Sequence, residues 1–153
     1  MKQSHRITAV VAALMTFGAF ASALAEDWQP AKFIPADQRP WKKGANLTGA
    51  EITGDRNKAG SLYVNQVIYA KGVRIMPHTH PDERVVTVLA GVFYQGIGMV
   101  FDETKAQALP PGSVVVIPPG TPRFGFAKDG DVTIEEIGIG PTATIPWPPS
   151  PAK

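Results

Sequence analysis

Residues 72–91 read GVRIMPHTHPDERVVTVLAG, and this stretch decides the fold. Between its two terminal glycines lie His78 and His80, which are separated by one residue and followed by acidic residues. Side chains of an extended chain repeat every second residue, so the two histidines share a face if this segment is a strand. Two imidazoles on one face can bind one metal ion, and Glu83 is the nearest candidate for a third ligand. The stretch therefore predicts β-structure that carries a metal site or the remnant of one.

The chain around this stretch also has a β-pattern, from about residue 48 to residue 140. Short runs rich in Val, Ile and aromatic residues alternate with turns that contain Gly and Pro. The clearest expected strands lie in SLYVNQVIYA (61–70), RVVTVLAG (84–91), VFYQGIGMVF (92–101), SVVVIPPG (113–120) and DVTIEEIGIG (131–140). No segment has a sustained helical period with caps at both ends. The sequence therefore predicts one all-β domain, an antiparallel sandwich or barrel.

The two ends of the chain have a different composition. Residues 1–25 combine a basic start with an apolar run and the small-residue ending Ala23-Leu24-Ala25, which predicts a secretory signal peptide and a periplasmic or secreted protein. Residues 26–47 contain Pro, Trp and Phe and predict an extended arm whose aromatic side chains pack on the domain. The Pro-rich residues 141–153 predict a flexible tail.

Charge and cysteine content exclude several classes of function. The chain has 15 Lys and Arg against 13 Asp and Glu, but residues 1–25 contribute two of the basic residues and no acidic one. The remaining chain therefore has no net formal charge, and its sequence shows no basic patch for nucleic acid or, after removal of the signal peptide, for a membrane surface. There is no cysteine, which excludes disulfides, cysteine nucleophiles and cysteine-type metal sites.

The spacing of glycines and histidines resembles the two motifs of the cupin superfamily. The first motif is matched by Gly72, His78, His80 and Gly91 at their family spacing. The second is matched by Gly112, the five residues SVVVI and the tripeptide Pro118-Pro119-Gly120. This resemblance covers about residues 48–140 and implies a cupin-type jelly-roll β-barrel. Many cupins dimerise, so a homodimer is a further expectation.

In the family, two histidines, a glutamate and a second-motif histidine hold a divalent metal. Only His78 and His80 carry over, because Arg84 and Arg123 stand at the other two positions. An arginine about 4 Å from a divalent cation is repelled by roughly 8 kcal/mol at an effective dielectric constant of 20. One hypothesis is therefore a modified metal site of His78, His80 and Glu83, with Fe, Mn, Zn or Ni, in a dioxygenase or isomerase acting on a small organic molecule.

The second hypothesis is a metal-free module that binds a small anion, such as a carboxylate. Arg84 and Arg123 would grip the anion with their planar donor groups, and Gln66 and Gln95 would reach the same cavity. A third hypothesis is a metal-free catalytic pocket in which one of the histidines acts as general base. The directions of the two arginine side chains discriminate between these hypotheses. Inward arginines contradict a metal site, and outward arginines contradict an anion site.

Register gives a first indication of these directions. If the even residues of the strand from Arg84 point inward, Arg84 enters the barrel and Glu83 points away. A bulge at Pro81 would instead turn Glu83 inward.

Overall fold

The structure is a computed structural model that describes residues 30–147. All strands among the described residues lie in the second of the chain's two units, residues 34–153. The predicted signal peptide, Trp28 and residues 148–153 lie outside the described residues. Among the described residues, no helix has the length and apolar character needed to cross a membrane.

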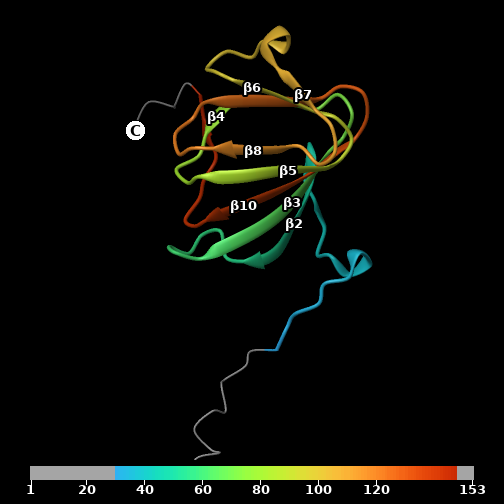
Figure 1. Cartoon of the computed structure of the whole chain (residues 1–153), viewed down its shortest axis with the longest axis vertical. Coiled ribbons are helices and arrows are strands. Elements are labelled where there is room, and N and C mark those ends of the chain that lie inside the picture. Colours follow the sequence, from blue (N-terminus) through green and yellow to red (C-terminus); the bar gives the residue numbers. More distant parts are fainter. Residues whose placement is uncertain (1–29, 148–153) are drawn as a thin grey trace, which may run out of the picture. The chain divides into compact units, whose positions relative to one another are not determined.

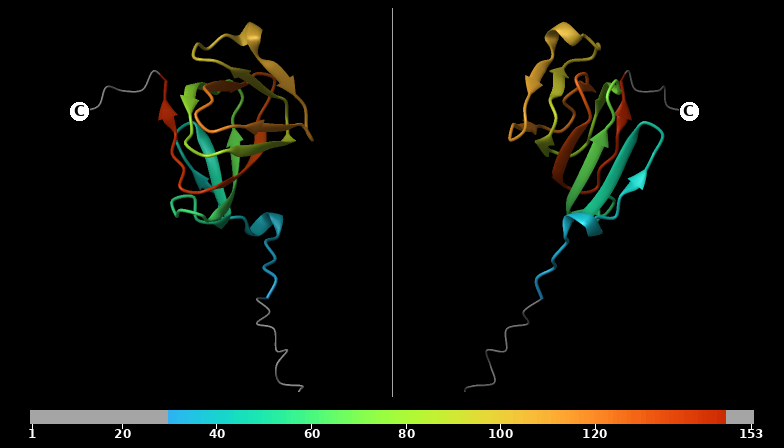
Figure 2. Two further views of the ribbon diagram at one scale, coloured as in Figure 1. Left: turned by 60° about the vertical axis from the view of Figure 1, so that its left-hand side comes forward. Right: turned by 90° about the vertical axis from the view of Figure 1, so that its right-hand side faces the viewer.

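Eleven strands form two antiparallel sheets, as the sequence pattern predicted (Figure 1). The six-stranded sheet has the order β1-β2-β3-β10-β5-β8, and the five-stranded sheet has the order β11-β4-β9-β6-β7. Figure 2 shows these sheets as two facing layers. The strands are β1 (Lys42–Lys43), β2 (Leu47–Gly54), β3 (Leu62–Tyr69), β4 (Arg74–Thr79), β5 (Arg84–Ala90), β6 (Phe93–Ile97), β7 (Gln107–Leu109), β8 (Val114–Ile117), β9 (Arg123–Ala127), β10 (Val132–Ile139) and β11 (Ile145–Pro146). Two short 3₁₀ turns, η1 (Ala36–Gln38) and η2 (Glu103–Lys105), complete the regular structure.

The two-residue period of β5 sets which side chains enter the space between the sheets. Arg84, Val86 and Val88 are buried, whereas the alternate residues Val85 and Thr87 are only partly buried. The inward residues of β5 continue a layer that runs across the neighbouring strands of the same sheet. This layer meets aromatic and aliphatic side chains of the opposite sheet, and the shared core contains Val67, Tyr69, Val86, Val88, Phe93, Leu109, Ile117, Ala127, Val132 and Ile134.

Residues 141–147 are part of the domain, which corrects the expectation that the tail is flexible from residue 141. Thr142 is buried, and β11 pairs with β4 so that Pro146 lies opposite His78. The Trp147 amide also donates a hydrogen bond of 2.9 Å to the Pro77 carbonyl. The proline-rich composition hid these contacts, because an edge strand needs few backbone donors and tolerates proline.

The expected N-terminal arm also contributes to a sheet. Lys42 and Lys43 of β1 pair with Thr48 and Gly49 of β2, within the range assigned to the arm. Trp41 is half-buried, whereas Phe33 is 86% exposed.

Candidate functional site

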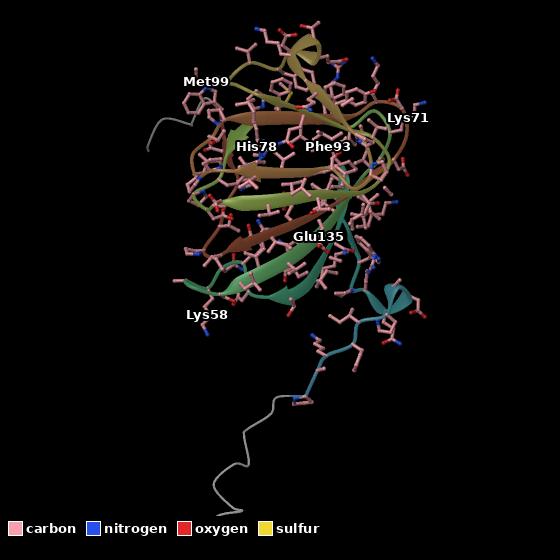
Figure 3. The ribbon with its side chains drawn as sticks, viewed as in Figure 1. Lys58, Lys71, His78, Phe93, Met99 and Glu135 are labelled. Atoms are coloured by element: carbon pink, nitrogen blue, oxygen red, sulfur yellow. The ribbon has the colours of Figure 1, made fainter. Side chains whose placement is uncertain are left out.

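The concave inner face of the domain holds a cleft with a volume of about 740 Å³. Its polar lining is basic, since five Lys and Arg residues face it against two Glu. A smaller void of about 20 Å³ adjoins the cleft, and both are lined by Tyr69, Ile75, His78 and Glu136. Arg123 and Gln95 line the smaller void. Figure 3 shows His78 and Phe93 in the space between the two sheets.

Arg84 enters the barrel and is fully engaged there. Its side chain is 2% exposed, and each of its three nitrogens has a protein partner. Nε donates to Asp82 at 3.3 Å, Nη1 to Glu136 at 3.1 Å and Nη2 to the Thr142 hydroxyl at 2.6 Å. The expectation that Arg84 grips a ligand is therefore corrected, because its guanidinium already holds together β5, β10 and the segment after β10.

Asp82 is the second centre of this network. Its carboxylate accepts hydrogen bonds from the hydroxyls of Tyr63 and Thr142 in addition to the bond from Arg84. Burial alone would raise the pKa of Asp82, but the hydrogen bonds from Thr142 and Tyr63 and the charge of Arg84 outweigh it and lower the pKa. Burial and the bond to Asp82 raise the pKa of Tyr63 to about 12. Asp82 is therefore ionised and Tyr63 neutral at neutral pH.

Arg123 also enters the barrel, but among the described residues it differs from Arg84 in having no ion-pair partner. It is 5% exposed and lines the small void. Burial and the charge of Arg84 lower the pKa of Arg123, while Glu136 acts in the opposite direction. The N–H donors of its guanidinium are therefore not engaged by a carboxylate of the described residues, and they lie beside the void.

The two histidines lie together and are neutral. Their rings are 5.0 Å apart between centroids and nearly perpendicular. His78 Nδ1 lies 2.8 Å from the Met76 carbonyl and donates to it, so Nε2 carries the free lone pair. Burial lowers the pKa of both histidines. The pKa of His80 falls to about 3, and the charges of Arg84 and Arg123 contribute to this decrease less than burial does.

The sequence-predicted residues Glu83 and Gln66 differ in their placement. Glu83 is exposed, while Asp82 and Arg84 on either side of it are buried, which corrects the expectation that Glu83 is a third metal ligand. The Gln66 amide donates to Glu135 at 2.8 Å. Gln66 is 5% exposed and lines the larger cleft, and its Oε1 is buried without a partner among the described residues.

Of four other site residues, only Gln95 was predicted from the sequence. Gln95 is buried in the void, and its Oε1 has no partner among the described residues. Glu136 and Asp82 were not predicted as residues of the site. Thr142 was missed, because nothing in a proline-rich segment signals that it returns to the barrel.

The residues at the family's metal position do not fit a divalent ion. Two neutral imidazoles are present, but Arg84 and Arg123 occupy the inner positions where further ligands would lie. Asp82 and Glu136 are already bonded to Arg84. Within residues 30–147 there is no group of three or more His, Cys, Asp or Glu that could hold a metal ion.

Comparison with solved structures shows that the chain has the cupin fold. An RmlC-like cupin from Shewanella frigidimarina matches with a TM-score of 0.58 and 18% identity over 73% of this chain and 94% of that chain. KdgF from a Halomonas species matches with a TM-score of 0.58 and 19% identity over 71% and 94%. The polyketide cyclase RemF from Streptomyces resistomycificus matches with a TM-score of 0.60 and 15% identity over 76% and 86%. No protein-family model and no curated protein matches the sequence.

Replacing Arg84 tests the buried network. Arg84→Met leaves Asp82 and Glu136 buried without their cation, so we expect the free energy of unfolding to fall by about 3–5 kcal/mol. Urea denaturation measures it. The matched control is Arg74→Met, which removes an exposed ion pair to Glu103 and should change stability by less than about 1 kcal/mol. Equal losses in the two variants would contradict the assignment.

The low pKa of His80 predicts acid destabilisation. The folded-state pKa is about 3, below the ordinary value of 6.5, so the unfolded chain binds a proton that the folded chain does not. Stability should therefore fall as the pH drops from 6.5 towards 3, by up to about 1.4 kcal/mol per pH unit. In His80→Gln the slope between pH 6.5 and 4.5 should be shallower by about that amount. Parallel slopes for the two proteins would refute a neutral buried His80.

Proposed function

We propose that this protein binds a small carboxylate in the cleft of the barrel without a metal ion, and that Arg123 is the anchoring cation. The observation that carries this proposal is the buried guanidinium of Arg123, which lines the small void and has no ion-pair partner among the described residues. A carboxylate offers two oxygens in the geometry that a guanidinium fork binds best. At about 4 Å and an effective dielectric constant of 20, the attraction is about 4 kcal/mol.

The surroundings of Arg123 support the entry of an anion. The larger cleft has a basic lining, which attracts anionic molecules to its mouth. The same lining includes apolar side chains such as Val67 and Val73, which suit the carbon skeleton of an organic acid. Arg84 keeps Glu136 occupied, so Glu136 does not neutralise Arg123 by direct contact.

A metal-dependent enzyme is the competing function, and the geometry disfavours it. A divalent ion bound to His78 and His80 would have two guanidiniums as neighbours and no carboxylate free to bind it. Solved structures with this fold include a polyketide cyclase, which supports a role with small molecules. We also propose export of the protein, on the signal-like sequence of residues 1–25.

The proposal predicts that charge and Arg123 together control binding. Phenylacetate should bind to the protein measurably, whereas its neutral analogue phenylacetamide should not. Arg123→Leu should weaken phenylacetate binding by about 100-fold, because it removes charge-assisted hydrogen bonds in a buried site. Isothermal titration calorimetry measures the affinities of wild type and variant. The protein is purified from cells that express the full chain.

Lys105→Leu is the control for charge alone. It removes one positive charge from η2, where Lys105 is 75% exposed and paired with Asp102. Binding should be unchanged in this variant. Equal affinity of wild type and Arg123→Leu for phenylacetate would refute the proposal.

A further inference from the structure

His78 and Arg123 are direct cross-strand neighbours beside the small void. They are register partners in the antiparallel pairing of β4 and β9, and both line the small void. Opposite residues of an antiparallel pair have Cβ atoms about 5 Å apart on the same face. One small molecule can therefore touch both side chains at the same time.

The two side chains need different groups on a ligand, since one side chain donates hydrogen bonds and the other accepts them. Arg123 has only donors, so it requires an acceptor. His78 donates through Nδ1 to the Met76 carbonyl, and its neutral ring presents Nε2 as an acceptor. Gln95 adds a second acceptor in the void, since its Oε1 is buried without a partner among the described residues. A ligand with a carboxylate alone would leave these acceptors without donors, at a loss of about 1–3 kcal/mol each.

The shape of the space sets where the ligand's donor must be. The void of about 20 Å³ beside Arg123 has room for a terminal group with atoms of about the size of water, and the rest of the ligand lies in the cleft. His78 lines both spaces, so it stands where they join. The carbon next to a carboxylate held by Arg123 would reach this junction. The donor therefore belongs on that carbon.

Charge decides between a hydroxyl and an ammonium as this donor. Arg84 and Arg123 both disfavour a positive charge at His78 and His80. An ammonium group at the junction would meet the same two cations, and the nearest carboxylate, Glu136, is already paired with Arg84. A hydroxyl donates the same hydrogen bond without a charge.

We infer that the ligand is a 2-hydroxycarboxylate, with its carboxylate on Arg123 and its hydroxyl donating to His78 Nε2 and facing Gln95. This inference rests on the proposed function and narrows its ligand class. It also gives His78 a positioning role in specificity that does not require a metal.

The test compares ligands that differ only at the 2-position. Calorimetric titration uses protein purified from cells that express the full chain. The ligands are both enantiomers of mandelate, then phenylacetate, then 2-phenylglycine. Lactate and propionate repeat the comparison of hydroxy acid and plain acid without the aromatic ring. We expect the better mandelate enantiomer to bind about tenfold more tightly than phenylacetate, as one added hydrogen bond requires, and phenylglycine to bind more weakly than mandelate.

Variants locate the preference within the site. In His78→Phe the ratio of mandelate to phenylacetate affinity should fall to about one, while phenylacetate itself still binds. His78→Gln keeps an acceptor and should retain part of the ratio, which is the control if His78→Phe does not fold. A wild-type ratio near one with both acids bound, or a ratio unchanged in His78→Phe, would overturn the inference but leave the carboxylate proposal standing. Tighter binding of phenylglycine would overturn it in favour of an amino acid. No binding of any of these acids would overturn the inference together with the carboxylate proposal.

Discussion

Two arginines inside one small β-barrel are the constraint on which the rest of the site depends. A buried charge without a partner is destabilising by several kcal/mol, so each guanidinium must find acceptors. Arg84 finds them in Asp82, Glu136 and Thr142. Arg123 has no ion-pair partner among the described residues, and the proposed anion site rests on this difference between two buried arginines.

The Arg84 network also shapes the wall of the cleft. It joins β5 to β10 and to the segment that leads into β11, and the Tyr63 hydroxyl attaches β3 through Asp82. The segment after β10 then runs along β4 beside the histidines. One buried cluster therefore positions the elements that surround His78 and Arg123. Because this cluster consumes both interior carboxylates, it also leaves neither of them free for a metal ion.

The fold and the inward direction of Arg84 could be predicted from local rules. The glycine frames and the two-residue period of β5 are properties of short segments, and both hold in the structure. The same period places Glu83 outside once no bulge turns it inward. The hydrogen bond from Arg84 to the Thr142 hydroxyl could not be predicted, because Thr142 lies 58 positions further along the chain in a proline-rich segment. Gln66 and Gln95 look alike in sequence, and only the structure shows that Gln66 lines the larger cleft and Gln95 the smaller void.

We propose that Arg84 and Arg123 stand in place of metal ligands and that the pocket binds an organic anion without a metal ion. Elemental mass spectrometry tests it directly, on untagged protein purified after incubation with Fe, Mn, Zn and Ni salts, beside a His78→Ala/His80→Ala variant. The account predicts far less than one ion per chain and no difference between the two proteins. Near-stoichiometric metal that is lost in the double variant would contradict it.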